Sequence, residues 1–246
     1  MKSLIDKALV YGAATAEAFS EALWPTRCVV CDMPGDVLCD RCRLQLPYLD
    51  WWRACPVCGA PHGRTQCTEC NRVMLARVGQ ERPPFDACAS TMLFESGAAR
   101  IVRAYKDQGE RRLAGEMAIM MANTIHPLWA RDSAAIVAIP ATAKAVRLRG
   151  FDHMDEIAQR LADALGLPTA RILARPKSVD QRALGRSERF VNLEGRFHVL
   201  PGATVPSALL LVDDVYTTGA TLFAASEALR VTGAQRIHCL TFARVY

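Results

Sequence analysis

Apolar residues follow two regular patterns after about residue 80 of this 246-residue chain. Short runs of consecutive apolar residues have the length of buried strands, and apolar residues three or four positions apart are typical of amphipathic helices. These patterns predict strands at 87–94, 135–139, 170–173, 209–213 and 236–242, and helices at 98–105, 111–125, 154–165 and 220–230. Strands and helices that alternate in this way favour an α/β fold, with a mostly parallel sheet flanked by helices.

The remaining segments lack this periodicity. Residues 141–153 are basic and interrupted by glycine, so we interpret them as a loop, and residues 174–206 are polar without a clear pattern. Residues before 80 contain clustered cysteines and tryptophans, preceded by a stretch that predicts an amphipathic helix. We therefore predict three parts: a helix over 1–24, a cysteine-rich module over 25–79 and the α/β domain over 85–246.

Composition narrows the class of protein. With 51% hydrophobic and 22% charged residues, the chain is neither disordered nor collagen-like. No stretch approaches the roughly 20 consecutive apolar residues of a membrane helix. Glu17 and Glu21 follow the N-terminal apolar patch, which argues against a signal peptide, so we expect a cytoplasmic protein without a membrane span. The net charge of +5 permits anionic ligands without indicating nucleic-acid binding by itself.

Four C-x-x-C pairs contain eight of the ten cysteines. They are Cys28 and Cys31, Cys39 and Cys42, Cys55 and Cys58, and Cys67 and Cys70. Zn²⁺ favours four thiolates and each pair supplies two sulfurs on one side of the ion, so two pairs complete one site. The short gaps favour two zinc ions held by consecutive pairs, a double zinc ribbon, while interleaved pairing stays open. Gly35 and Gly59 fit the tight turns of such sites.

Other roles compete for some of these residues. A disulfide framework or a set of redox dithiols fits four serial pairs less well than metal does. Trp51 and Trp52 lie between the two halves of the module, where we expect them to fill its small core, and stacking on nucleic-acid bases is the alternative. Cys88 and Cys239 lie in apolar strands and are expected in the core, and His62 is not needed as a zinc ligand.

The run LLLVDDVYTTGAT at 209–221 is the most specific signal in the chain. A buried strand ends in Asp213 and Asp214, and a turn of hydroxyls and glycine then opens a helix. Backbone N–H groups and the helix dipole at such a turn favour a phosphate. The carboxylates accept hydrogen bonds from sugar hydroxyls or hold water around Mg²⁺. The pattern therefore predicts a phosphorylated ribose as ligand.

Alternative phosphate and acidic motifs fit this segment less well. A Walker loop and a dinucleotide fingerprint need glycine spacings that are missing here. A receiver domain also has an acidic pair after a strand, but only 32 residues follow Asp214 in the 246-residue chain, which is too few. A helix cap formed by Asp214 with Thr217 or Thr218 accounts for only a small part of the pattern.

The segment at 209–221 resembles the phosphoribosyl-pyrophosphate motif of type I phosphoribosyltransferases. The run IVAIP at 136–140, the basic residues 144–149 before Gly150 and Phe151, the segments at 181–184 and 186–192, and the double zinc ribbon resemble the ComF family. The likeness covers roughly residues 25–246. It implies a type I phosphoribosyltransferase fold preceded by the zinc module.

The resemblance also implies roles for individual residues. Asp213 and Asp214 would contact the ribose 2- and 3-hydroxyls. The 5-phosphate would lie in the loop of Thr217, Thr218, Gly219, Ala220 and Thr221. Pyrophosphate would lie near Ala141, beside a mobile flap with Lys144, Arg147 and Arg149. Mg²⁺ would accompany the ligand, and no catalytic residue is identified.

The flap departs from the family pattern at two positions. Asp152 and His153 stand where family members usually have Asn and Gln. Asp152 would repel a pyrophosphate unless Mg²⁺ intervened, and His153 is expected to face solvent at the start of a helix. A second basic group, expected to form a solvated helix face, comprises Arg100, Arg103, Lys106, Arg111 and Arg112. By family likeness, the mouth of the site would carry Arg182, Arg186 and Arg189.

Three functions stay open at this point. The first is phosphoribosyl transfer, in which catalysis comes from positioning and from neutralising the leaving pyrophosphate. The second is DNA uptake in natural competence, where ribbons and basic loops would hold single-stranded DNA beside a competence protein partner. The third is a ligand-responsive regulator, because one fold can host enzymes and regulators.

Overall fold

The computed structural model describes residues 25–174 and 197–246, and these residues divide after Gln45 into two compact units. The predicted helix over 1–24 lies outside the described residues. So do the family-like segments at 181–184 and 186–192, with Arg182, Arg186 and Arg189. The domain boundaries expected at 24–25 and 79–84 stay a prediction.

The described part of the first unit is a cysteine-bearing turn followed by one short helix. Arg27 and Pro34 pair as an antiparallel bridge, and Arg27 Nη1 donates a hydrogen bond to the Asp32 carbonyl at 2.8 Å. Gly35 has a φ of 126°, a conformation that glycine adopts readily, as expected for a tight turn at this position. Helix α2 (Asp40–Leu44) then begins after Cys39.

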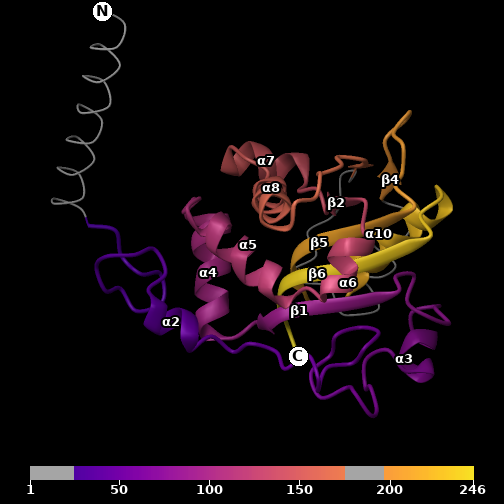
Figure 1. Ribbon diagram of the computed structural model, residues 1–246, viewed down its shortest axis with the longest axis horizontal. Helices are drawn as coiled ribbons and strands as arrows, with labels where there is room; N and C mark the ends of the chain where they lie inside the picture. The colour runs from indigo at the N-terminus through magenta and orange to yellow at the C-terminus, as the bar shows by residue number, and fades with distance from the viewer. Residues whose placement is uncertain (1–24, 175–196) are drawn as a thin grey trace, which may run out of the picture. The chain divides into compact units, whose positions relative to one another are not determined.

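A four-stranded parallel sheet forms the centre of the second unit (Figure 1). The strand order is β1-β6-β5-β2, and each neighbouring pair is parallel. These strands are β1 (Ala87–Leu93), β2 (Ala135–Ala138), β5 (Ala208–Tyr216) and β6 (Arg236–Arg244). The short strands β3 (Leu173–Ala174) and β4 (His198–Val199) pair antiparallel beside it. The α/β fold with a mostly parallel sheet is confirmed.

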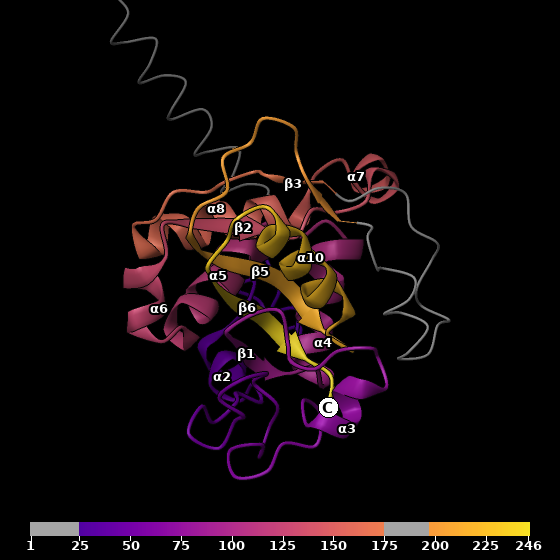
Figure 2. The ribbon, with the colours of Figure 1, turned by 90° about the vertical axis from the view of Figure 1, so that its right-hand side faces the viewer.

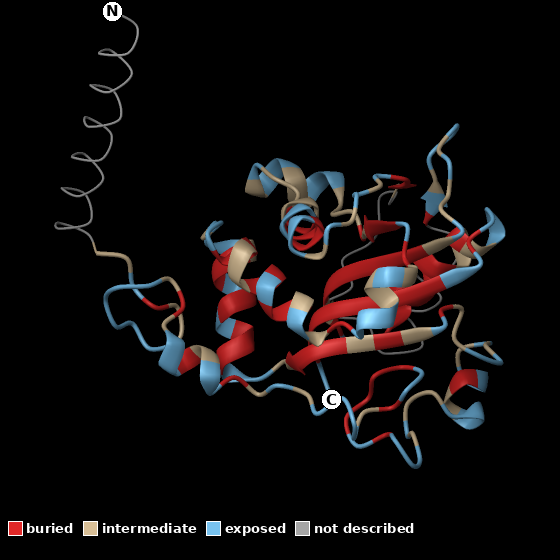
Figure 3. Ribbon diagram, in the orientation of Figure 1, coloured by how far each residue is buried: buried red, intermediate tan, exposed pale blue. Residues whose placement is uncertain are grey.

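Helices bury the sheet, whose strands are red along most of their length in Figure 3. The helices described in this unit are α3 (Arg72–Ala76), α4 (Ser96–Asp107), α5 (Leu113–Thr124), α6 (Pro127–Asp132), α7 (Ala143–Arg149), α8 (His153–Leu165) and α10 (Ala220–Val231), of which α7 has no buried residue. Helix α10 packs on a cluster that includes Val137, Leu209, Leu211 and the buried Cys239. Helices α5 and α8 contact each other and the strands. Strands buried in this way read as continuous apolar runs, which is why the sequence revealed them.

The segment from Leu46 onward attaches the second cysteine cluster to the sheet. Leu49 N–H donates to the Thr91 carbonyl at 3.0 Å, and Leu93 N–H donates to the Pro47 carbonyl at 2.9 Å. At the start of β1, Cys88 N–H donates to the Val57 carbonyl at 2.9 Å. These bonds satisfy the backbone groups at the outer edge of β1, and they make the second cluster part of the same compact unit as the sheet.

The structure differs from the sequence predictions in four places, and the first is the strand expected at 170–173, where only Leu173 belongs to a strand, β3. The expected loop at 141–153 contains helix α7, which begins after its Thr142 cap and ends at Gly150 with a φ of 82°. Helix α6 was not predicted, because six residues are too few for a clear helical period. Strand β5 extends beyond Asp213 to Tyr216, since β6 continues to pair with it as far as Arg244.

Candidate functional site

The acidic pair lies near the carboxyl end of β5, the sheet edge at which open α/β folds bind ligands. Asp213 and Asp214 are both buried, with relative exposures of 9% and 5%. Asp213 Oδ1 accepts a hydrogen bond from the Asp214 N–H at 2.9 Å. The loop that opens α10 follows three residues later, so the predicted carboxylates and the predicted phosphate loop occupy one end of the sheet.

Two basic side chains from other helices converge on Asp214. His153 Nε2 lies 2.9 Å from Asp214 Oδ2, and Lys106 Nζ forms an ion pair with the same oxygen. Both predictions for these residues were wrong: Lys106 does not belong to a solvated face, and the His153 side chain is only 8% exposed. A buried carboxylate needs such partners because desolvation otherwise disfavours its charge.

His153 is held through both its ring and its backbone. Arg149 Nη1 lies 3.2 Å from His153 Nδ1, and Tyr105 O–H donates to the His153 carbonyl at 2.7 Å. Burial raises the pKa of Tyr105 well above its usual value, which disfavours loss of the donated proton still further. Helices α4, α7 and α8 thus jointly orient the imidazole toward Asp214.

Asp152 organises the turn after β2. Its Oδ1 accepts hydrogen bonds from Met154 N–H at 3.0 Å and Asp155 N–H at 3.4 Å, which caps α8. Its Oδ2 accepts the Ala141 N–H at 3.0 Å, an amide expected near a pyrophosphate. Aspartate is a favoured N-cap residue, so capping was a signal that sequence reasoning missed here.

The loop 217–221 starts α10 at a glycine in the left-handed region. Gly219 has a φ of 83° and is the N-cap residue, and Ala220 N–H donates to Thr218 Oγ1 at 3.4 Å. Thr217 is exposed, whereas Thr218 and Thr221 are half-buried. The first turn of a twelve-residue helix therefore presents hydroxyls and amides at the same sheet edge as the acids.

The three basic flap residues do not act as one group. Lys144 and Arg147 are exposed on α7. The Arg149 side chain is only 17% exposed and lies 3.9 Å from Asp107 as well as beside His153. Arg149 thus belongs to the cluster around Asp214, and the two exposed residues can meet an anion from solvent.

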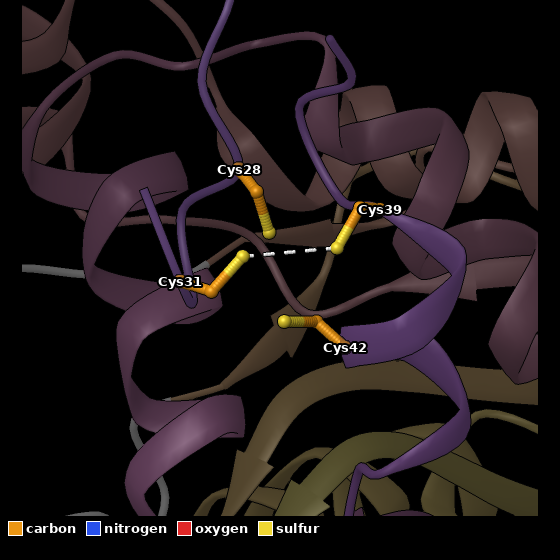
Figure 4. A group of neighbouring side chains, drawn as sticks. All are labelled: Cys28, Cys31, Cys39 and Cys42. Carbon is orange, nitrogen blue, oxygen red and sulfur yellow. Dashed lines mark hydrogen bonds between the residues drawn. The ribbon is translucent and has the colours of Figure 1, made fainter. Parts of the chain in front are cut away.

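Each cysteine cluster brings together four sulfurs from consecutive C-x-x-C pairs. The two clusters are Cys28, Cys31, Cys39 and Cys42, which we call the first four-cysteine group, and Cys55, Cys58, Cys67 and Cys70, the second four-cysteine group. Figure 4 shows the first group, with its four sulfurs pointing toward one another. The pairing is sequential, as the short gaps favoured.

The sulfur spacing fits zinc. Cys31 and Cys39 sulfurs are 3.8 Å apart, Cys55 and Cys70 sulfurs 3.6 Å, and Cys58 and Cys67 sulfurs 3.5 Å. A Zn–S distance of about 2.3 Å in a tetrahedron places ligand sulfurs about 3.8 Å apart. All eight cysteines are free thiols, so two zinc ions are compatible with the two groups, and each ion would fix two chain turns.

Trp51 and Trp52 do not fill the core of the cysteine module. Their relative exposures are 67% and 56%, and their rings meet edge to face with centroids 6.1 Å apart. The core-filling prediction was wrong, because the second four-cysteine group packs against β1 and not around the tryptophans. The approach is close: a Cβ added to Gly59 would lie 2.6 Å from the Cys88 carbonyl oxygen. Cys88 and Cys239 are buried, as predicted.

This protein therefore belongs to a class that combines a parallel α/β domain with two four-cysteine groups. The central strand of that domain carries an acidic pair near its end. The chain is 24% identical to competence protein ComFC of Bacillus subtilis over 201 residues, which cover 81% of this chain and 80% of the relative. It is 28% identical to DNA utilization protein YhgH of Salmonella typhimurium over 222 residues, 83% of this chain and 95% of the relative. It is 26% identical to competence protein F of Haemophilus influenzae over 234 residues, 89% and 96% of the two chains.

No family model matches the sequence. The chain is thus similar to ComF-type competence and DNA utilization proteins over most of its length, and its two four-cysteine groups and parallel sheet fit the resemblance to the ComF family that its motifs predicted. Among the helices within 25–174 and 197–246, none has the length and apolar character needed to cross a membrane.

Proposed function

We propose that this chain binds phosphoribosyl pyrophosphate or a related nucleotide at the end of β5, as part of DNA uptake or use. The observation that carries the proposal is the buried pair Asp213 and Asp214 at the same sheet edge as the loop 217–221. Relatives named for competence and for DNA utilization support the role in DNA use. A cytoplasmic location agrees with this role.

Each part of the site has a matching part of the ligand. The two carboxylates accept hydrogen bonds from ribose hydroxyls, and the amides and threonine hydroxyls of the 217–221 loop donate to the 5-phosphate. Lys144 and Arg147, exposed on α7, attract the pyrophosphate. Lys106 and His153 hold Asp214 in place for the ribose. Mg²⁺ would neutralise the phosphates when it arrives with the ligand.

Calorimetric titration with phosphoribosyl pyrophosphate, with and without Mg²⁺, tests this proposal. We expect Mg²⁺-dependent binding by the zinc-loaded protein and loss of roughly 100-fold or more in affinity in the Asp213→Asn, Asp214→Asn double variant, because hydrogen bonds to charged groups are each worth about 1.5–3 kcal/mol. Asp132→Asn, on α6, is the control and should bind normally. Absence of heat and of a thermal shift at millimolar ligand with the wild-type protein would refute the proposal.

Turnover is a separate question for the same site. In a transfer reaction, an acceptor nucleophile would attack the anomeric carbon, the bond to pyrophosphate would break, and pyrophosphate would leave with the bonding electrons. Pyrophosphate release in the presence of candidate acceptors distinguishes an enzyme from a regulator, which would bind the same ligand without release.

A second candidate function, single-stranded DNA binding, is favoured by one observation: the exposed pair Trp51 and Trp52. Exposed aromatic rings provide faces on which bases stack, and this is largely independent of base sequence. Arg53 follows the pair in sequence, and Arg64 is bonded to it through the backbone. The Arg53 side chain is 62% exposed, and its carbonyl accepts the N–H of the exposed Arg64 at 3.0 Å. Aromatic faces beside guanidinium groups suit a strand of stacked bases with an anionic backbone.

Replacing Trp51 and Trp52 with alanine is expected to weaken binding of an oligothymidylate about 30-fold or more, since stacking is worth about 1–3 kcal/mol per base and two rings are removed. Fluorescence anisotropy across a salt series measures this, and the salt slope should stay unchanged because phosphate contacts remain. Leu148→Ala removes an even more exposed apolar side chain and should have no effect. Equal affinities of the double variant and the wild-type protein would exclude the tryptophan pair as a DNA-binding surface.

A further inference from the structure

A buried arginine joins the second four-cysteine group to the carboxyl end of the sheet. Arg244, the last residue of β6, has a side-chain exposure of 0%. Its Nη1 donates to the Cys58 carbonyl at 2.7 Å, and its Nη2 lies 4.0 Å from the Cys58 sulfur. Nη2 also forms an ion pair with Glu69, which stands between Cys67 and Cys70. Both oxygen partners of this guanidinium therefore belong to the segment that carries the second four-cysteine group.

The same guanidinium also packs on Tyr216, the residue that precedes the 217–221 loop. Arg244 stacks over the ring of Tyr216, with Cζ 3.7 Å from the ring centroid. Tyr216 is the last residue of β5, is buried and pairs in register with Arg244. A cation over an aromatic face is attractive, and the attraction grows when water is excluded, as it is here. The stack therefore fixes the position of the tyrosine ring.

The tyrosine ring in turn supports the loop 217–221. A Cβ added to Gly219 would lie 2.6 Å from the Tyr216 Cζ and closer still to the hydroxyl oxygen, so the glycine backbone rests directly on the ring. A continuous set of contacts thus leads from Cys58 and Glu69 through Arg244 and Tyr216 to the loop. Figures 1 and 2 both show the C-terminal end of the chain beside the turns that precede α3.

The contacts depend on the fold of the segment that carries the second four-cysteine group. Glu69 N–H and Cys70 N–H both donate to the Cys67 sulfur at 3.4 Å, so a metal-bound thiolate would hold the turn that carries Glu69. Small four-cysteine segments derive their fold from the metal they bind. Without metal, the partners of a fully buried cation would lose their fixed positions, and a buried charge cannot stay unpaired.

We propose that metal bound by the second four-cysteine group positions the 217–221 loop through Arg244 and Tyr216. The proposal deepens the proposed function, because it makes phosphoribosyl binding depend on this metal. Arg244 and Tyr216 are positioning residues, since they act through the loop and not on a ligand. The first four-cysteine group belongs to the other compact unit and is not part of this set of contacts.

Hydrogen exchange of the full-length protein, measured by mass spectrometry without any ligand, tests the proposal. In the Cys70→Ser variant, amides of residues 217–222 should exchange about 10-fold faster or more, as expected when a loop loses its supporting contacts. Cys39→Ser, an equally half-buried cysteine of the first group, should leave exchange at 217–222 unchanged. Arg244→Lys should retain two zinc ions by metal analysis and yet show the faster exchange, because an ammonium group lacks the planar face and fork of the guanidinium.

Stepwise zinc removal from the wild-type protein keeps the test independent of variant folding. A chelator that empties the second group should accelerate exchange at 217–222, and added zinc should restore protection. Unchanged exchange in both the emptied protein and the Cys70→Ser variant would overturn the proposal. Calorimetry with phosphoribosyl pyrophosphate separates the two ideas: no binding by the wild-type protein refutes the proposed function alone, whereas equal binding by wild-type and Cys70→Ser proteins refutes the coupling.

Discussion

Replacing Gly219 with alanine is expected to weaken phosphoribosyl-pyrophosphate binding roughly 100-fold, because the change combines a positive-φ penalty with a steric conflict. Gly219 has a φ of 83°, and the new methyl carbon would lie 2.6 Å from the Tyr216 Cζ and closer still to the hydroxyl oxygen. Neither the tyrosine nor the loop can move easily, since Tyr216 stacks against the buried Arg244. The loop must therefore leave the position in which its amides face a phosphate. Calorimetric titration in the presence of Mg²⁺ measures the loss.

The chain contains a matched control for this substitution. Gly202 has a φ of 78°, but nothing lies within 4 Å of a Cβ at that position. Gly202→Ala should therefore cost about 1 kcal/mol of unfolding free energy, from the backbone conformation alone, and leave ligand binding unchanged. If Gly219→Ala bound the ligand as tightly as Gly202→Ala does, the loop would not be the phosphate site.

Replacing Lys106 with methionine is expected to lower the free energy of unfolding by roughly 3 kcal/mol, as when one partner of a largely buried ion pair is removed. The Asp214 side chain is 7% exposed and Lys106 22% exposed, so water compensates poorly for the lost partner. His153 then remains beside Asp214 Oδ2. Urea denaturation measures the loss.

A double-mutant cycle separates the ion pair from other effects of the substitution. Lys106→Met, Asp214→Asn and the combined variant should give a coupling energy of about 1–3 kcal/mol, since the two side chains are in contact. Arg103→Met, an exposed position on the same helix α4, should change the free energy of unfolding by less than about 0.5 kcal/mol. Equal losses for Lys106→Met and Arg103→Met would show that the pair with Asp214 does not stabilise the fold.

The sequence determined the elements whose signals are local. Buried parallel strands read as apolar runs, so β1, β2, β5 and β6 were found close to their observed bounds. The C-x-x-C pairs are close in sequence, so each four-cysteine group forms from two consecutive pairs. The acidic strand end and the glycine turn after it occupy thirteen successive residues, so one motif located both halves of the candidate site.

Local signals also mark the boundaries of α7 and α8. Thr142 and Gly150 are good cap residues at the two ends of α7, in a segment interpreted as a loop. Asp152 stands where an N-cap is favoured before α8, and its carboxylate caps that helix. These cap residues lie in a positively charged segment, and the charge alone does not distinguish a loop from a helix.

Tertiary structure alone decided which distant side chains meet. His153 and Asp214 are 61 residues apart in sequence, and Arg244 and Cys58 are 186 apart, yet each pair is in hydrogen-bonding contact. An amphipathic pattern places Lys106 on a helix but does not say whether its ammonium group reaches solvent or a carboxylate at the sheet edge. Likewise, the sequence does not reveal that the two adjacent tryptophans are exposed. These outcomes depend on how helices and turns pack across the sheet, where burial requires each charge to find a partner.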